Sequence, residues 1–338
     1  MKKYISAFTC ASVLLLLLLV ACGSPAQAVT SGNANSAQAG RTPATSLAPT
    51  ATRSGRTSAA LLTPTATRTG RTPVATVAPA LTSTAQGLPR PAHVVIVIEE
   101  NHSFRNVIGS GSAPYLTSLA NRGALFTNSV AITHPSQPNY LALFSGSTHG
   151  ISSDSCPHTF TSANLASELI AAGFSFGGYS EGLPKPGYTG CTKGPYARKH
   201  NPWVNFTTVP SRANLPFSRF PNSSHFSSLP TVSFIIPNLN DDMHNGTIRQ
   251  GDTWLKNHLA AYVQWAETHN SLLIVTWDEN DGSPGNQIPT LFVGQMVKTG
   301  RYSERINHYT VLRTLEAMYG LPALGNSAHL SPITDCWR

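Results

Sequence analysis

Three runs of consecutive apolar residues, rich in Val and Ile, constrain the fold of this chain more than any other feature. They lie at 93–98, 231–236 and 271–277. A run that is apolar at every position, rather than at alternate positions, is typical of a strand buried on both faces of a parallel sheet. We expect shorter strands at 174–179 and 291–293, and amphipathic helices at 162–172, 252–268 and 310–319. Strands that alternate with helices predict an α/β fold, a doubly wound and mainly parallel sheet with helices on both faces.

The N-terminal segment predicts export. A lysine pair precedes an apolar run at 11–21, which is too short to span a bilayer comfortably. The run ends in the letters LVACG, which resemble a bacterial lipobox with Cys22 as the acylated residue. We therefore predict a lipoprotein signal peptide over 1–22 and a protein anchored by lipid on the extracytoplasmic face of the cell membrane. The alternative is an ordinary signal peptide cleaved after Ala28, which leaves a secreted protein.

Residues 23–90 are rich in Ala, Thr, Ser, Pro and Gly, and they repeat the tripeptide Gly-Arg-Thr at 40–42, 55–57 and 70–72. A segment of this composition cannot bury enough apolar area to offset the entropy of ordering the chain. We therefore expect a disordered stalk over 23–90, followed by one folded domain over 91–338.

The formal net charge of +8 does not indicate a nucleic-acid-binding domain. Eight of the 23 basic residues precede residue 91 and none of the 15 acidic residues does, so the predicted domain is formally neutral. Binding to nucleic acid depends on Lys and Arg clustered on the domain itself. We expect no nucleic-acid partner, and we expect a monomer.

The cysteines are consistent with an oxidising compartment. Cys156, Cys191 and Cys336 lie in the predicted domain, and two of these three can pair. Since Cys156 and Cys191 flank one loop-rich segment, we predict a disulfide between them. The pairing of Cys336 stays open.

Polar residues follow each of the three long apolar runs, at 99–104, 237–244 and 278–281. In open α/β sheets ligands bind beyond the carboxyl ends of the strands, so we expect these clusters to share one site. One such cluster alone fits a turn or a helix cap, but three in equivalent positions are harder to explain in that way. Carboxylates held close together need a cation or a shared proton, and oxygen ligands with His favour a divalent or ferric ion.

A fourth polar segment lies at 134–144. Pro138 suits the first turn of a helix, which places Ser136 just before the helix N-terminus. Free N–H groups and the helix dipole attract anions at such a position. Ser136 is therefore a candidate nucleophile beside an anion site, and the alternative is that it only caps the helix.

In this combination and order, four segments resemble motifs of the bacterial phosphoesterase family. They are IEENHSF at 98–104, PSQPNY at 135–140, DMH at 242–244 and WDE at 277–279. This family contains acid phosphatases, secreted phosphatidylinositol 3-phosphatases and non-haemolytic phospholipases C, and it belongs to the alkaline-phosphatase-like superfamily. The resemblance extends from His93 to Leu321, and the compact spacing is more similar to the small phosphatase branch.

The resemblance implies a metal-dependent phosphomonoesterase that acts through a phosphoserine. It implies metal binding by Glu100, Asn101, Asp242, Asp278 and Glu279, catalysis by Ser136, His244 and His308, and substrate binding by Asn139 and His200. Many two-metal relatives in the superfamily carry Asp-His where this chain has Asp278-Glu279. The resemblance therefore implies one divalent or ferric ion rather than two.

The predicted substrate is a phosphate monoester or a phosphoinositide, attacked by the Ser136 hydroxyl while a His protonates the leaving oxygen. A phospholipase C-type phosphodiesterase with the same nucleophile is one alternative. A lipid-anchored protein that binds a phosphate ligand without turnover is another. A glycosidase that uses Glu100 and Asp278 is a third, although it leaves Ser136, Asn139 and His244 unexplained.

The lipobox is testable with Cys22→Ala, which removes the residue that carries the lipid. We expect this variant to leave the membrane fraction while the domain keeps its activity, because the anchor and the domain are separate segments. Membrane fractionation with an activity assay measures both effects. A variant that is cleaved at the same place and still fractionates with membranes would show that the anchor lies elsewhere.

Overall fold

A computed structural model describes residues 87–338. The predicted signal peptide, Cys22 and the predicted stalk up to residue 86 lie outside the described residues. The first described residues already contact the domain, since Leu88 is buried and the Arg90 guanidinium lies 4.7 Å from the centre of the Phe174 ring. Contacts with the domain thus begin before the predicted boundary at Pro91. Within 87–338, no helix combines the length and the apolar character that a membrane span requires.

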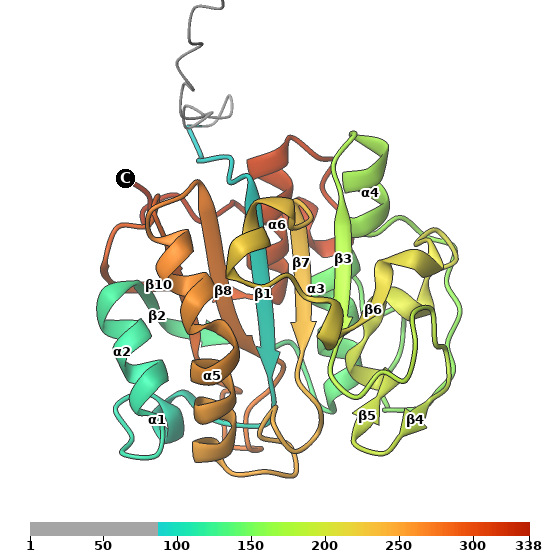
Figure 1. The fold of residues 1–338 in the computed structure, drawn as a ribbon, viewed down its shortest axis with the longest axis horizontal. Helices are drawn as coiled ribbons and strands as arrows, with labels where there is room; N and C mark the ends of the chain where they lie inside the picture. The colour runs from blue at the N-terminus through green and yellow to red at the C-terminus, as the bar shows by residue number, and fades with distance from the viewer. Residues whose placement is uncertain (1–86) are drawn as a thin grey trace, which may run out of the picture. The chain divides into compact units, whose positions relative to one another are not determined.

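One mixed sheet forms the centre of the domain (Figure 1). Its strands are β1 (His93–Glu99), β2 (Ala124–Val130), β3 (Phe176–Ser180), β6 (Asn214–Pro216), β7 (Val232–Ile236), β8 (Ser271–Trp277), β9 (Thr290–Gly294) and β10 (Gly300–Asn307). Their order across the sheet is β10-β2-β9-β8-β1-β7-β3-β6. Only β9 is antiparallel to its neighbours among these described strands. Two further short strands, β4 (Thr192–Lys193) and β5 (Tyr196–Ala197), pair with each other.

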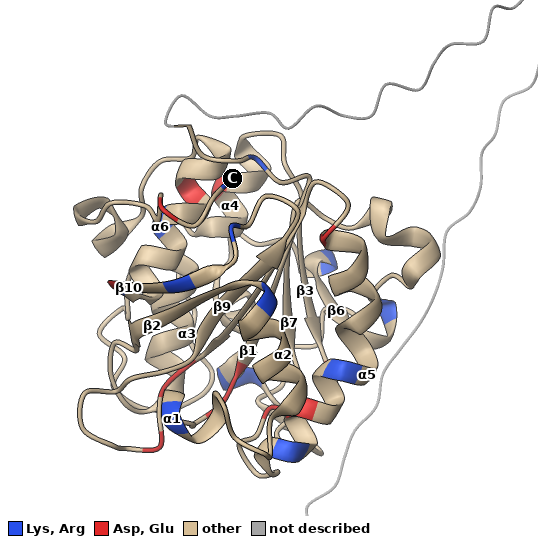
Figure 2. Ribbon diagram, turned by 90° about the vertical axis from the view of Figure 1, so that its left-hand side faces the viewer, with Lys and Arg blue, Asp and Glu red and all other residues tan. Residues whose placement is uncertain are grey.

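Helices cover both faces of the sheet. They are α1 (Phe104–Val107), α2 (Pro114–Arg122), α3 (Ser136–Ser145), α4 (Leu165–Ala171), α5 (Ile248–Ala266) and α6 (His308–Tyr319). Short 3₁₀ turns are η1 (Arg198–His200), η2 (Pro202–Asn205), η3 (Ser211–Ala213), η4 (Phe217–Arg219), η5 (Ser223–Ser228) and η6 (Gly325–His329). Figure 2 shows α6 and α5 on opposite sides of the sheet.

Alternation along β1 explains why its sequence is apolar at every position. Val94 and Ile96 lie in a core with side chains of α3, α4 and α6, whereas Val95 and Val97 lie in a second core with α2 and α5. Successive side chains of a strand point to opposite faces, so both faces of β1 are covered. The doubly wound, mainly parallel sheet that the sequence predicts is confirmed.

Several elements differ from the predictions. β2, β10 and α2 are not predicted, because they lack a continuous apolar run; β10 is largely exposed at the edge of the sheet. The antiparallel direction of β9 is not predicted either. α5 begins about a turn earlier than expected, because the Thr247 side chain accepts a hydrogen bond from the Gln250 N–H and caps the helix.

One glycine determines how closely a functional segment approaches the sheet. Gly178 of β3 lies against Trp203, and a Cβ added at Gly178 would be 2.2 Å from Trp203 Cε2. Trp203 is buried, and its Nε1 donates to Asn214 Oδ1 at 2.9 Å. Its segment continues from η1, so Gly178 permits the packing that fixes η1 beside the sheet.

We expect Gly178→Ala to reduce the free energy of unfolding by about 1–3 kcal/mol, the usual effect of overpacking a buried contact. The matched control is Gly111→Ala, where an added Cβ meets nothing within 4 Å. Thermal melting of both variants measures the difference. Equal melting temperatures would show that Trp203 can move away at no cost.

Candidate active site

The three predicted polar clusters meet at the carboxyl edge of the sheet. The Glu100 N–H donates to the Asp242 carbonyl at 2.8 Å, and the Asp278 N–H donates to the Glu99 carbonyl at 3.0 Å. The Asn101 N–H donates to Asp278 Oδ1 at 3.2 Å, with Asn101 in the left-handed region at φ 55°. These contacts join the residues that follow β1, β7 and β8.

Ser136 is the first residue of α3, and its hydroxyl faces carboxylates. Its Oγ donates to Glu100 Oε2 at 3.1 Å and lies 3.5 Å from Glu279 Oε1. Pro135 occupies the N-cap position, and no side chain caps this helix through a hydrogen bond. The geometry therefore does not support the alternative that Ser136 only caps α3.

The Glu100 carboxylate is fully buried and contacts three groups. Ser136 and the Tyr140 hydroxyl donate to it, and His200 Nε2 lies 2.9 Å from it as an ion pair. Burial alone would raise the pKa of Glu100, but the charge and hydrogen bond of His200 outweigh burial and lower this pKa to about 2. Glu100 is thus held as a carboxylate.

His200 lies between two carboxylates rather than open to a substrate. Its Nε2 contacts Glu100, and its Nδ1 lies 3.3 Å from Asp242 Oδ2. The ring stacks on Tyr140 with a centroid distance of 5.0 Å. Burial disfavours the charged ring, yet the two carboxylates raise the pKa of His200 to about 9. We therefore interpret His200 as a counter-charge to Glu100 and Asp242, and its predicted role in substrate binding stays a prediction.

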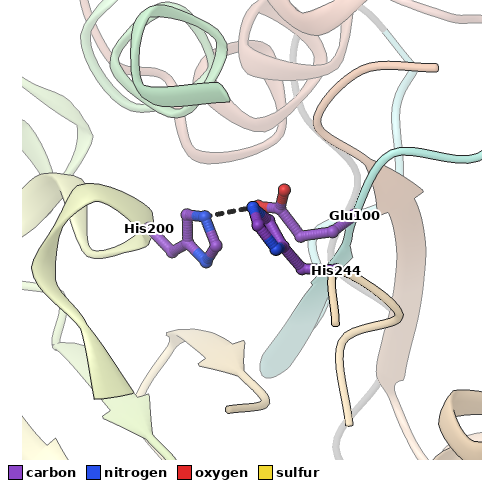
Figure 3. A group of neighbouring side chains, drawn as sticks. All are labelled: Glu100, His200 and His244. Carbon is purple, nitrogen blue, oxygen red and sulfur yellow. Dashed lines mark ion pairs between the residues drawn. The ribbon is translucent and has the colours of Figure 1, made fainter. Parts of the chain in front are cut away.

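The imidazole of His244 is more accessible to solvent than that of His200. Figure 3 shows it beside Glu100 and His200, and one possible ligand atom from each of these three residues lies within 4.8 Å of the others. His244 Nδ1 lies 2.9 Å from Asn245 Oδ1, and His244 Nε2 lies 3.3 Å from Lys199 Nζ. This arrangement leaves His244 at the entrance to the buried carboxylates, in reach of a bound substrate.

Asp278 and Glu279 add two more carboxyl groups. Burial, followed by the negative charge of Glu100, raises the pKa of Glu279 to about 8 and also raises the pKa of Asp278. Glu279 Oε2 lies 2.8 Å from His134 Nδ1. Carboxyl groups this close to Glu100 repel one another, so a cation among them would stabilise the charged forms.

The donor set fits a hard cation. Asn101 Oδ1 and Asp278 Oδ2 are buried and have no hydrogen-bond partner among the described residues. A buried polar atom without a partner costs about 1–3 kcal/mol, which a coordinated ion would offset. Carboxylate and amide oxygens are ligands of divalent and ferric ions. Since both nitrogens of His200 already face carboxylates, the oxygens of Glu100, Asn101 and Asp278 are the better ligand set.

Asn139 and His308, which the resemblance assigns to substrate binding and catalysis, make hydrogen bonds to neighbouring segments in this structure. Asn139 Oδ1 accepts the N–H groups of Ile132 and Thr133 at 3.0 and 3.1 Å, and its Nδ2 donates to the Thr133 carbonyl at 2.9 Å. Asn139 therefore braces the loop before α3. His308 Nε2 donates to the Asp278 carbonyl at 2.6 Å, and burial lowers the pKa of His308 to about 4. His308 thus positions Asp278 and is a poor proton donor.

Lys199 and Asp154 contact the site but are not predicted from the sequence. Lys199 Nζ lies 2.8 Å from Asp154 Oδ2, while Asp154 Oδ1 accepts the Gln137 N–H at 2.9 Å. Lys199 directly precedes His200, and this neighbour is the one feature of the sequence that indicates a position for Lys199 near the site. Asp154 has no such clue, because it lies in a loop far from the strand ends.

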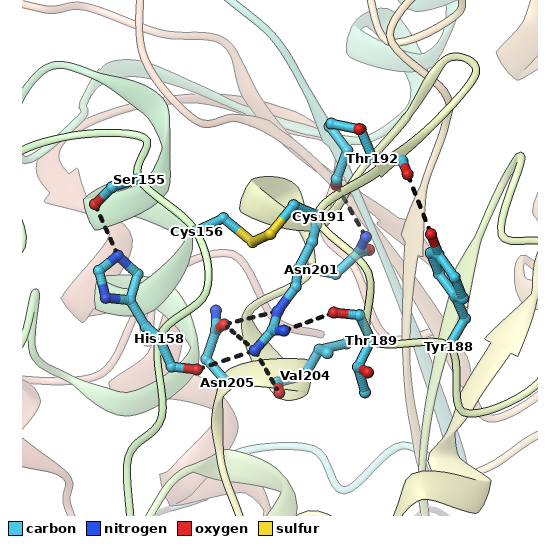
Figure 4. Close-up of a disulfide and its surroundings, with 12 residues drawn as sticks. Ser155, Cys156, His158, Tyr188, Thr189, Cys191, Thr192, Asn201, Val204 and Asn205 are labelled. Atoms are coloured by element: carbon cyan, nitrogen blue, oxygen red, sulfur yellow. Dashed lines mark hydrogen bonds between the residues drawn. A yellow bond between two sulfur atoms is a disulfide. The ribbon is translucent and has the colours of Figure 1, made fainter. Parts of the chain in front are cut away.

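A disulfide joins the Asp154 loop to the Lys199 segment. Cys156 and Cys191 form the predicted bond, with a Cα–Cα distance of 5.9 Å, and Cys336 is free and buried. Figure 4 shows this disulfide together with Thr189, Val204 and Asn205. The Arg198 guanidinium donates to the Thr189 and His158 carbonyls and to Asn205 Oδ1, at 2.6 to 3.1 Å. These bonds hold η1 against the Asp154 loop.

Comparisons with known proteins agree with this geometry. The sequence matches the Phosphoesterase family over residues 110–322. It is 55% identical over 254 residues to a phosphatidylinositol-3-phosphatase of Mycobacterium tuberculosis, a match that covers 75% of this chain and 85% of that protein. It is 34% identical over 227 residues to a phosphate-repressible acid phosphatase of Penicillium chrysogenum, covering 62% of this chain and 55% of that protein. The chain thus spans little more than half of this fungal relative.

The fold is shared with a solved structure from Vibrio parahaemolyticus, a protein of the alkaline phosphatase superfamily. The TM-score is 0.53 at 13% identity, over 76% of this chain and 75% of that one. Fold and site together define a hydrolase of phosphate esters. The chain belongs to the Phosphoesterase family.

The cation site is testable with Asp278→Asn. We expect this variant to lose bound metal and more than about tenfold in rate, since even indirect partners of a metal site contribute 10–100-fold. Asp281→Asn, in the same loop but bonded to Ser103 and Asn106, is the matched control. Metal analysis and rates on the same samples measure both effects. Full activity of the unaltered protein in a rigorously metal-free sample would contradict the assignment.

Proposed function

We propose that the protein is a metal-dependent phosphomonoesterase, of the acid phosphatase or phosphatidylinositol 3-phosphatase type, that acts through a phosphoserine at Ser136. The observation that carries the proposal is the position of the Ser136 hydroxyl, buried at the start of α3 and 3.1 Å from the Glu100 carboxylate. A serine that only stabilised the helix would direct its oxygen to a backbone N–H instead.

The first step is in-line attack of Ser136 Oγ on the phosphorus of the monoester. Ser136 Oγ is oriented by Glu100 Oε2 at 3.1 Å, and its proton passes to the ionised form of Glu279, whose Oε1 lies 3.5 Å away and whose pKa of about 8 makes it the stronger base. A cation held by Glu100, Asn101 and Asp278 would lower the pKa of the serine hydroxyl and offset negative charge on the phosphoryl oxygens.

The remaining groups bind the phosphoryl oxygens and move protons. The Lys199 ammonium, at the entrance beside His244, supplies positive charge where the phosphoryl oxygens become more negative. His244 protonates the leaving alcohol and then deprotonates the water that cleaves the phosphoserine. His200, which is buried behind Glu100, keeps that carboxylate in place during both steps.

The names of the relatives support a monoesterase. The mycobacterial relative is named a phosphatidylinositol-3-phosphatase, and the fungal one an acid phosphatase. Both names describe removal of a terminal phosphate from a monoester. We therefore favour a monoester or a phosphoinositide as the substrate.

We also propose that the enzyme acts outside the cytoplasm, anchored through Cys22 and separated from the membrane by the stalk over 23–90. The disulfide between Cys156 and Cys191 supports this location, because such bonds persist in oxidising compartments.

The proposal predicts that Ser136→Ala loses on the order of a thousandfold or more in rate, over about 4 kcal/mol of barrier, while the melting temperature stays nearly unchanged. Ser145→Ala, at the other end of α3, is the matched control: Ser145 donates to the Leu141 carbonyl and lies away from the carboxylates. Rates and melting curves of both variants are the measurement.

Trapping of a phosphorylated intermediate in acid-quenched samples adds a direct readout. The intermediate should be present in the unaltered enzyme and missing in Ser136→Ala. A variant that melts early but keeps most of its rate would make Ser136 a structural residue and exclude the phosphoserine.

A further inference from the structure

A cavity of about 550 Å³ adjoins the candidate active site. Its lining comes from the chain segment 130–134 and the loop 282–286, which are hydrogen-bonded to each other, and from Arg305 of β10. This volume is within the usual range for small-molecule sites. None of the mechanistic roles described above uses this cavity.

His134 connects the cavity to the reacting hydroxyl. It lines the cavity, and its Nδ1 lies 2.8 Å from Glu279 Oε2. The other oxygen of that carboxylate, Oε1, lies 3.5 Å from Ser136 Oγ. The His134–Glu279 pair therefore links the lining of the cavity to the Ser136 hydroxyl.

The walls of the cavity are held rigidly. The Ala131 N–H donates to the Asn286 carbonyl at 2.9 Å, and Asn286 Nδ2 donates to the Thr133 carbonyl at 3.0 Å. Asn139 braces the same segment through Thr133. The loop 282–286 turns at Gly285, whose φ of 87° is in the region that favours glycine. A pre-formed cavity of this kind binds a ligand without first having to order its walls.

The charge of the cavity favours an anion. His134 and Arg305 are the ionisable residues that line it, and no carboxylate does so among the described residues. Arg305 is exposed, and while its backbone pairs with β2, its guanidinium makes neither an ion pair nor a hydrogen bond with any residue from 87 to 338. A guanidinium group presents paired N–H donors that match the oxygens of a phosphate. Arg305 is thus free to bind an anionic group at the edge of the cavity.

We propose that this cavity binds the alcohol part of the substrate and that Arg305 binds a second phosphate group on that alcohol. The inference rests on the proposed function and narrows its substrate class to monoesters of polyols that carry another phosphate. The phosphodiester of a phosphoinositide headgroup has this chemistry, and so does a soluble inositol bisphosphate. A simple aryl phosphate leaves the Arg305 contact unused.

The experiment compares kcat/KM of Arg305→Ala and the unaltered enzyme on three substrates: p-nitrophenyl phosphate, inositol 1,3-bisphosphate and dibutanoyl phosphatidylinositol 3-phosphate. We expect the ratio of kcat/KM for the phosphoinositide to that for the aryl phosphate to fall about tenfold, through KM, as for the loss of one charge-assisted hydrogen bond. Arg305→Lys should recover part of this ratio. Arg301→Ala, exposed on the same strand but outside the cavity, is the matched control and should keep the ratio.

The outcomes separate the two proposals. An equal fall for the inositol bisphosphate assigns the contact to any second phosphate, whereas a fall for the phosphoinositide alone assigns it to the lipid diester; both support the inference. An unchanged ratio in Arg305→Ala, with all substrates hydrolysed, overturns the inference and leaves the proposed function intact. An unaltered, metal-loaded enzyme that hydrolyses none of the three substrates overturns the proposed function and the inference with it.

Discussion

The arrangement of the site depends on one buried negative charge, the carboxylate of Glu100. This group ends the central strand and has no exposed surface, so water cannot stabilise it. Its donors come instead from α3, through Ser136 and Tyr140, and from η1, through His200. Removing one partner of a buried ion pair typically costs about 3–5 kcal/mol, so this interaction strongly favours a single arrangement. The Ser136 hydroxyl is therefore held in its orientation because it is one of the groups that take the place of water around Glu100.

The parts of the fold and site that follow from local sequence are those built on the central strands. β1, β7 and β8 are mostly apolar, without alternation of apolar and polar residues, because both faces are covered, and the sequence shows this directly. Their neighbouring, parallel arrangement brings Glu100, Asp242 and Asp278 to one edge. Ser136 is predictable for a similar reason, since the proline after it indicates the helix start. By contrast, β10 lies exposed at an edge, and its alternating polar sequence gives no comparable indication.

The parts that cannot be predicted depend on contacts between distant segments. Asp154 contacts Lys199 of η1 and the Gln137 N–H from a loop that the Cys156–Cys191 disulfide ties to a distant segment, and spacing alone does not show these contacts. The residue types at Asn139, His200 and His308 are those that phosphate binding or acid catalysis would require. Their polar atoms nevertheless face neighbours from other segments, which makes them supporting groups. Which side chain is free to react is decided by tertiary contacts.

Negative side chains lie at the buried floor of the site and positive side chains lie nearer the surface. This order favours the entry of an anionic phosphate ester. The carboxylates of Glu100 and Asp278 lie at the floor with almost no exposure, where only a cation or a buried imidazolium can compensate them. Lys199 is partly exposed and His134 more so, at 19% and 44% of their side chains, and Arg305 lies further out on an exposed strand edge. An incoming anion thus meets positive groups first. Without a cation this acidic floor would repel the phosphate, so the cation proposed for Glu100, Asn101 and Asp278 is what would draw the phosphate to the level of Ser136. The positive groups outside and the cation inside would together set the depth at which the serine attacks.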